Sequence, residues 1–355
     1  MTDRLERPED LRLADWQPRS TLVARRTDVP RSAVPCIDAH NHLGRWLTGP
    51  GWTAPDVGAL LDLMDAHGVE LVVNLDGMHG AELEANLDRY DRPHPRRFRT
   101  FCQLDWDLLA ADDGERLLAD QLRDCAARGA AGVKVWKTVG LRVRDATGAL
   151  VLPDDPRVVR TLALAGDLGL PVLIHVADPV AFFQPLDARN ERVDELLAVP
   201  EWSFADTTRF PTFDRLLTAL ETLVLATPGT TYIGAHVGCV AEDLDRVERL
   251  LAAAPNWNVD IAGRMAELGR QPRRTRRLIE RFGDRVLFGT DAFPLTGEAL
   301  TTHFRFLETD DEAFEYAPGE PVPPQGRWTV SGLHLAPEQL EAVYAGNARR
   351  LLSLP

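Results

Sequence analysis

Two histidines separated by one residue constrain this chain more than any other feature. His40 and His42 lie in the stretch V-P-C-I-D-A-H-N-H-L-G, which runs from Val34 to Gly44 and begins like an apolar strand. Side chains at positions i and i+2 of a strand point to the same face, so a strand that ends here would aim both imidazoles at one point. Two convergent imidazoles are half of the ligand set of a tetrahedral metal site.

Three later strand-like runs end in residues that complete such a site. P-V-L-I-H ends at His175, T-Y-I-G-A-H ends at His236, and R-V-L-F-G-T-D ends at Asp291. Apolar runs of this kind are typical of buried parallel strands, and parallel sheets place their chemistry at the carboxyl ends of the strands. One histidine after a strand is more often structural, but four strand ends with imidazole or carboxylate groups favour a shared site.

The order of the predicted elements favours a single barrel. Strand-like runs alternate with helical segments in eight rounds, and no glycine-rich dinucleotide motif follows the first strand. We therefore expect an α/β protein with one TIM-like (β/α)8 barrel over residues 34–355 and long loops after its strands. Residues 1–33 are rich in charge and proline and are expected to form an N-terminal arm. Helices are predicted over residues 54–68, 113–128, 155–168, 213–226, 242–254 and 337–352.

Composition excludes some classes of partner. The net charge of −14 argues against binding to a nucleic-acid backbone, which requires a basic face. No stretch reaches the ~20 apolar residues of a membrane span, and the first residues lack the apolar core of a signal peptide. The four cysteines are scattered and are expected to be reduced. A cytoplasmic protein without a membrane partner is predicted.

Several polar side chains near the predicted strand ends are candidates for substrate binding. The fourth strand, A-G-V-K-V-W-K, carries Lys134 and Lys137. A lysine inside an apolar strand is costly unless it is paired or functional, and Lys134 would either bind a substrate carboxylate or become carbamylated and bridge two metals. Arg264 is shaped for bidentate contact with a carboxylate, with an ion pair to Glu267 as the alternative. Trp46 is a candidate for an apolar wall.

The ligand set as a whole resembles the amidohydrolase superfamily. The resemblance rests on D-A-H-N-H after the first strand, histidines after the fifth and sixth, G-T-D after the eighth, and a terminal G-N-A-R-R-L-L, and it covers residues 34 to 353. Within the superfamily, the chain looks most like the group that contains aminocarboxymuconate semialdehyde decarboxylase and related metal-dependent hydrolases.

The resemblance implies a metal centre and a set of roles. His40, His42, His175 and Asp291 would bind one divalent metal, most often zinc, and His236 would be the acid/base group. Asp291 would also serve as a base. A zinc ion lowers the pKa of a bound water to ~7, and a histidine with a pKa of ~6.5 can exchange protons near neutral pH. The alternative is a second metal held by carbamylated Lys134, in which case His236 would be a ligand.

Three functions remain open from the sequence. The first is a metal-dependent hydrolase of a small organic acid, amide, ester or lactone. The alternative is a non-oxidative decarboxylase of an unsaturated or aromatic carboxylate, and the third is a barrel that only binds or scaffolds. The cationic candidates at the predicted mouth favour a small anionic substrate. A homodimer is compatible with the sequence.

Overall fold

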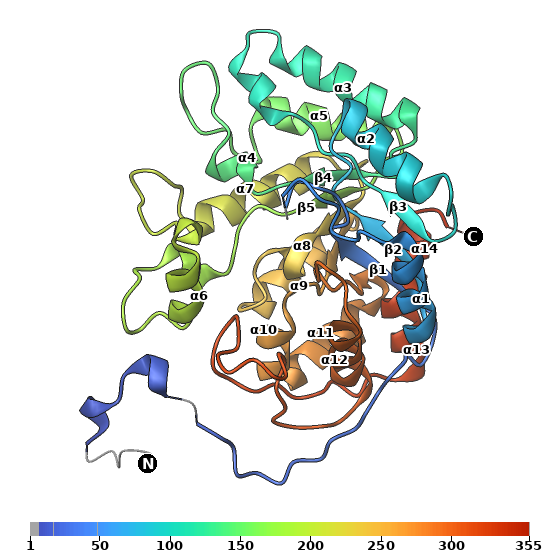
Figure 1. The fold of residues 1–355 in the computed structure, drawn as a ribbon. Helices are drawn as coiled ribbons and strands as arrows, with labels where there is room; N and C mark the ends of the chain where they lie inside the picture. Colours follow the sequence, from blue (N-terminus) through green and yellow to red (C-terminus); the bar gives the residue numbers. More distant parts are fainter. Residues whose placement is uncertain (1–6, 17, 48, 355) are drawn as a thin grey trace.

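A computed structural model describes residues 7–16, 18–47 and 49–354, and its centre is a barrel of eight parallel strands surrounded by helices (Figure 1). The strands are β1 (Cys36–Asn41), β2 (Val69–Asn74), β3 (Phe98–Thr100), β4 (Val133–Val135), β5 (Val172–Ile174), β6 (Tyr232–Gly234), β7 (Trp257–Asp260) and β8 (Val286–Leu287). Each strand is followed by at least one helix on the outside. The predicted (β/α)8 fold is confirmed.

Backbone contacts between two sheets close the barrel. Strands β1 to β3 form one hydrogen-bonded sheet, and strands β4 to β8 form the other. A parallel bridge between Cys102 and Val133 joins the first sheet to β4. On the opposite side, the amide of Ala39 donates to the carbonyl of Phe288 at 3.0 Å and joins β1 to the end of β8. Because all strands run parallel, their carboxyl ends meet at one end of the barrel, where the polar residues are.

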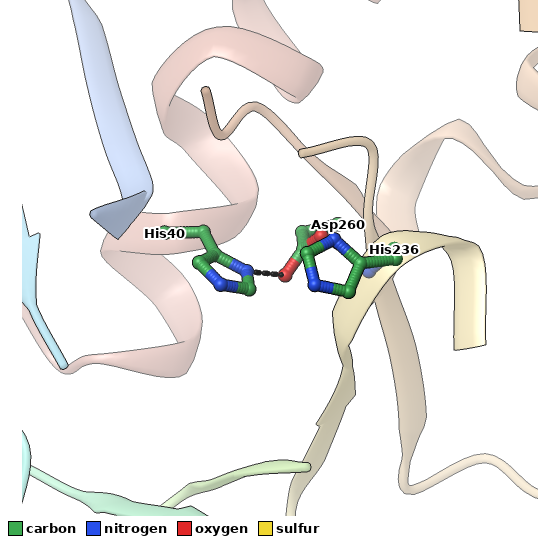
Figure 2. A group of neighbouring side chains, drawn as sticks. All are labelled: His40, His236 and Asp260. Carbon is green, nitrogen blue, oxygen red and sulfur yellow. Dashed lines mark hydrogen bonds and ion pairs between the residues drawn. The ribbon is translucent and has the colours of Figure 1, made fainter. Parts of the chain in front are cut away.

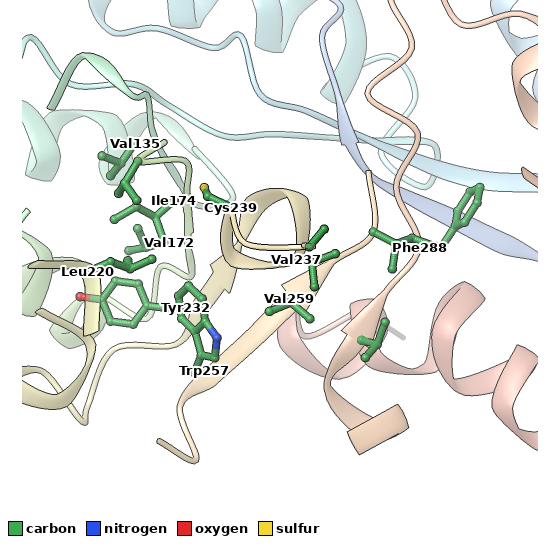
Figure 3. Packing of buried hydrophobic residues seen from close by; sticks show 14 of the residues in the cluster. Val135, Val172, Ile174, Leu220, Tyr232, Val237, Cys239, Trp257, Val259 and Phe288 are labelled. Atoms are coloured by element: carbon green, nitrogen blue, oxygen red, sulfur yellow. The ribbon is translucent and has the colours of Figure 1, made fainter. Parts of the chain in front are cut away.

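Inward and outward side chains form two separate hydrophobic clusters. The smaller one fills the barrel with residues such as Ile37, Leu71 and Leu173. The larger one lies between strands and helices, and Figure 3 shows the part around Tyr232 and Trp257. This alternation is the period-2 pattern expected for strands that are covered on both faces.

The helices lie where the sequence predicted them, with one irregular end and several additions. They are α1 (Val57–His67), α2 (Gly80–Asn86), α3 (Gly114–Arg128), α4 (Thr138–Leu141), α5 (Pro156–Asp167), α6 (Val193–Ala198), α7 (Phe213–Ala226), α8 (Ala235–Gly238), α9 (Leu244–Ala253), α10 (Met265–Arg270), α11 (Pro272–Phe282), α12 (Gly297–Glu308), α13 (Pro337–Glu341) and α14 (Asn347–Leu351). The π-helical turn η8 (Ala342–Gly346) separates α13 from α14 within the predicted last helix. Across the described ranges, no helix is long and apolar enough to cross a membrane.

The segment before β1 runs along the outside of the barrel (Figure 1). Within its described part, Leu22 and Val23 are fully or largely exposed. The segment is attached near α12, where the hydroxyl and amide of Thr27 donate to Asp311 at 2.8 and 2.7 Å. The amide of Ala33 donates to Glu308 at 3.0 Å. These bonds fix the approach of the chain to β1.

Gly234 at the end of β6 is required for packing against Trp257. A Cβ at Gly234 would lie 2.3 Å from Cζ2 of the buried Trp257, a distance that forces the ring or the strand to move. We expect Gly234→Ala to lower the free energy of unfolding by about 2–3 kcal/mol. Urea unfolding of this variant beside Gly229→Ala, where a Cβ meets open space, measures the difference. Equal stabilities of the two variants would contradict this packing account.

Candidate metal centre

A bulge in β1 aims both histidines of the H-N-H motif into the barrel. Ala39 already packs in the interior cluster, so regular alternation would turn His40 outward. Between Asp38 and Asn41, however, β1 advances three residues against two of β2. Nδ2 of Asn41 therefore reaches Oδ2 of Asp38 at 3.0 Å on the same side of the strand. The extra residue brings His40 and His42 to one site, with their ring centroids 5.6 Å apart.

Each of these imidazoles is anchored at Nδ1 by a buried carboxylate. Nδ1 of His40 lies 2.8 Å from Oδ2 of Asp260, and Nδ1 of His42 lies 2.6 Å from Oδ1 of Asp76. Burial holds the pKa of His40 well below its usual range, so this ring is neutral and carries its one hydrogen on Nδ1. Its Nε2 lone pair then faces the site. Carboxylates that orient histidines in this way are typical of metal centres.

Asp291, which follows β8, lies between histidines that come from β1 and from the end of β6. One carboxylate oxygen, Oδ1, is 3.4 Å from Nε2 of His42 and 3.7 Å from Nε2 of His40. The other, Oδ2, is 3.8 Å from Nε2 of His236. Nδ1 of His236 is bound to the carbonyl oxygen of Ala262 at 2.7 Å, so its Nε2 also faces inward. The ligand atoms of His40, His42 and Asp291 lie within 4.8 Å of one another.

Asp260 links the first and sixth strands of the site (Figure 2). Its Oδ2 contacts His40, and its Oδ1 accepts a hydrogen bond of 2.8 Å from the backbone amide of His236. These three residues form a second group whose ligand atoms lie within 4.8 Å. Burial raises the pKa of Asp260 to about 7. No role for Asp260 was predicted from the sequence. Two polar residues two apart in an otherwise apolar strand, Asn258 and Asp260, were the available signal.

His175 lies beside the group but has a different orientation. Its ring centroid is 4.5 Å from that of His236. Its Nε2 lies 3.1 Å from the carbonyl oxygen of Ala177, while its Nδ1 is buried without a hydrogen-bond partner in the described part of the chain. Since the carbonyl can only accept, Nε2 carries the hydrogen and Nδ1 has a free lone pair. An orphaned imidazole lone pair next to other ligands fits a metal that binds there.

Lys134 is buried at the centre of the site. It faces inward from β4 with no exposed surface, and its Nζ lies 3.3 Å from Nε2 of His40. Among the described residues, no carboxylate oxygen lies within 4.0 Å of this nitrogen. Burial lowers the pKa of Lys134 to about 8, although Asp291 and Asp260 partly oppose the effect. Of the 40 basic residues in the chain only two are lysines, Lys134 and Lys137.

A cavity of about 360 Å³ opens onto the site, and His175, His236 and Asp291 line its floor. Its walls come from loops that follow several strands. The apolar lining consists of Leu47, Trp136, Leu141, Pro179, Phe182, Trp202, Phe204 and Phe293, and the polar lining includes Lys137, Arg142, Asp178, Glu195, Arg264 and Gln325. The long loop after β5 and the segment 309–335 both contribute, as expected for loops at the carboxyl end of a barrel.

The predicted substrate-binding residues take different positions. Lys137 and Arg264 line the cavity, but Nζ of Lys137 is paired with Oδ2 of Asp178 at 2.6 Å. Trp46 lies behind the wall, where its Nε1 donates to Asp76 at 2.6 Å and its ring packs edge-on against Trp136. Lys134 does not line the cavity.

These features define a (β/α)8 barrel whose strand ends gather imidazoles and a carboxylate below a substrate-sized cavity. A family model described as Amidohydrolase matches residues 37–354, and the chain therefore belongs to this family. The resemblance inferred from the sequence is confirmed, and the protein is an enzyme of the amidohydrolase superfamily. A comparison with curated protein sequences gave no match.

Solved structures that resemble the chain include decarboxylases and an amidohydrolase. A 2,6-dihydroxybenzoate decarboxylase in complex with 2,6-dihydroxybenzoate is 18% identical, covers 90% of this chain and 100% of its own, and has a TM-score of 0.55. A dihydroxybenzoic acid decarboxylase from Polaromonas sp. JS666, with manganese and 2-nitroresorcinol, is 17% identical, and the match covers 90% of this chain and 97% of that one with a TM-score of 0.56. An amidohydrolase from Burkholderia multivorans with bound zinc is 16% identical, and the match covers 91% of this chain and 100% of that one with a TM-score of 0.52. At these identities the likeness shows the shared fold alone.

Proposed function

We propose that the protein is a metal-dependent hydrolase that cleaves an amide, ester or lactone bond in a small anionic substrate. The observation that carries this proposal is the position of Lys134. A buried ammonium beside an imidazole, without a carboxylate within 4.0 Å in the described ranges, is electrostatically costly. A modification that converts the lysine into an anionic ligand removes that cost.

Lysine carbamylation meets this requirement. The neutral amine of Lys134 attacks CO2, a new N–C bond forms, and one proton leaves, so that a carbamate with two oxygen atoms results. A pKa of about 8 leaves a share of the amine neutral near pH 7. Arginine, which fills the other basic positions except Lys137, cannot be deprotonated and could not take this role. The carbamate oxygens would face the histidines of the centre.

We assign the ligands accordingly. His40, His42 and Asp291 would hold one divalent metal, and His175 and His236 a second, with carbamylated Lys134 between them. Zn²⁺ suits imidazole and carboxylate ligands, and Mn²⁺ occupies one of the similar folds. A bound metal would polarise the scissile carbonyl and lower the pKa of water.

The proton transfers are assigned to side chains at the floor of the cavity. Oδ2 of Asp291 would take the proton from the attacking water and return it to the leaving group. If a single metal is bound by His40, His42, His175 and Asp291, then His236 becomes the acid/base group. Its Nε2 lies 3.8 Å from Oδ2 of Asp291, and the anchored Nδ1 keeps the ring in one orientation.

Substrate binding is assigned to the cavity walls. Arg264 would bind an anionic group of the substrate, because its guanidinium lines the cavity without a paired carboxylate among the described residues. Lys137, paired with Asp178, would contribute a hydrogen bond from the rim. Trp46 would support the ring of Trp136 rather than contact the substrate.

Decarboxylation is the second candidate. The aromatic lining of the cavity, which includes Trp136, Phe182 and Phe293, suits an aromatic carboxylate. Two of the similar folds belong to dihydroxybenzoate decarboxylases. In that reaction His236 would deliver a proton to the ring carbon that loses CO2.

Isotope labelling separates the two reactions. The metal-loaded protein is screened in H2¹⁸O against aromatic amides, esters and lactones that carry a carboxylate, together with the dihydroxybenzoates. Hydrolysis places one ¹⁸O in the new acid and releases no CO2 from the substrate. CO2 release without uptake of ¹⁸O would assign the protein to the decarboxylases. Protein stripped of metal is the control, and full turnover by it would contradict both mechanisms.

A further inference from the structure

A buried arginine behind the cavity wall holds two glutamates. Arg192, at the start of α6 in the loop after β5, is only 1% exposed. Its Nη1 donates to Oε2 of Glu195 and its Nη2 to Oε1 of Glu267, both at 2.5 Å. Arginine is the cation best suited to buried pairs because its fork reaches two acids at once. Burying these charges costs desolvation free energy, so the arrangement is not explained by a gain in stability alone.

Both glutamates are natural partners for Arg264. Glu267 follows Arg264 by three residues and lies in the first turn of α10, a spacing that brings helical side chains together. Glu195 lines the same cavity as Arg264. The sequence alone therefore offered an Arg264–Glu267 ion pair. In the structure Glu267 pairs with Arg192 instead, so the predicted alternative of an Arg264–Glu267 ion pair is wrong.

Arg264 makes no direct ion pair with a described carboxylate, although its charge partly opposes the rise that burial causes in the pKa of Glu195 and of Glu242. Its Nη1 donates to the carbonyl oxygen of Gly263 at 2.8 Å, and its Nε is buried with no partner. Over the part of the chain that the structure describes, no carboxylate oxygen lies within 4.0 Å of the guanidinium. Of the other cations in the cavity lining, Lys137 is paired with Asp178 and Arg142 is exposed to solvent. Among the described cations that line the cavity, Arg264 is thus the buried one that makes no ion pair.

We propose that Arg192 is a positioning residue that withholds Glu195 and Glu267 from Arg264, so that Arg264 binds a carboxylate group of the substrate. The inference rests on the proposed function, because it takes the cavity to be the substrate site. It defines the substrate class more closely as small organic acids whose carboxylate lies beside the reacting bond, since Arg264 follows Gly263, which approaches both Asp291 and His236.

The test compares two variants that differ only at Glu195. Arg192→Met with Glu267→Gln removes the buried pair without leaving Glu267 charged, and it frees Glu195 to pair with Arg264. Adding Glu195→Gln removes that competitor. The probe is benzoate, titrated into the full-length protein by calorimetry and by quenching of tryptophan fluorescence, because Trp136 and Trp202 line the cavity. Circular dichroism verifies that each variant is folded.

We expect the double variant to bind benzoate about tenfold more weakly than wild type, and the triple variant to recover wild-type affinity within about twofold. A merely structural role of Arg192 would weaken both variants equally, and that result would overturn the inference. So would a double variant that binds as tightly as wild type.

Arg264→Met separates this inference from the proposed function. We expect this variant to lose about 30-fold or more in benzoate affinity. If it does, and the double variant does not weaken, only the role of Arg192 fails. If Arg264→Met binds benzoate as wild type does, the anion site of the proposed function fails together with the inference.

Discussion

Replacement of Asp291 by asparagine is expected to lower kcat/KM by about 10³-fold or more. The carboxylate faces three Nε2 atoms at 3.4 to 3.8 Å and is assigned both a ligand and a base function. Asparagine keeps the size of the side chain but cannot accept the proton or supply the negative charge. It also tolerates the positive φ of 55° at this position, so the fold should be retained. Steady-state kinetics with the substrate found by screening give the measurement.

The matched control is Asp62→Asn on the exposed face of α1. We expect its kcat/KM to equal that of wild type, because Asp62 lies on a surface helix. An Asp291→Asn variant that retains more than about a tenth of wild-type kcat/KM would exclude Asp291 as the base.

Substitution of Lys134 by alanine is expected to have the second large effect. The variant loses the carbamate that would join the two metal positions, and kcat should fall by about 10²- to 10⁴-fold. We expect a short carboxylate such as propionate to enter the space left by the side chain and to supply a similar pair of oxygens. Millimolar propionate should therefore restore part of the activity to Lys134→Ala but none to Asp291→Asn.

Lys134→Arg is the control for charge. Arginine retains a cation but cannot be carbamylated, so this variant should be as inactive as Lys134→Ala. Activity of Lys134→Arg close to that of wild type would show that a positive charge is sufficient and would remove the basis for the carbamate.

Much of the fold followed from local patterns in the sequence. The helix 213–226 was predicted with the bounds that α7 has, and in the structure Thr212 caps its first turn. The strand ends at His175, His236 and Asp291 were recognised because short apolar runs stop at polar residues. These signals depend only on residues near one another in the chain.

The rest depended on contacts between distant segments. The bulge between Asp38 and Asn41 is set by the register against β2. The alternation rule correctly predicted that His40 and His42 share a site, but it did not include the bulge that turns His40 inward. The anchoring of His40 by Asp260 joins residues 220 positions apart. The ion pair of Glu267 with Arg192 rather than with Arg264 likewise depends on the fold, because Arg192 lies in a different loop.

The metal content of the purified protein tests the central claim most directly. Elemental mass spectrometry of wild type and Lys134→Ala, both grown with added zinc and bicarbonate, counts the ions per chain. We expect two divalent metals in wild type and one or none in the variant. One metal in both proteins would contradict the carbamate bridge and transfer the acid/base role to His236, and no metal in folded wild type would contradict a metal-dependent mechanism altogether.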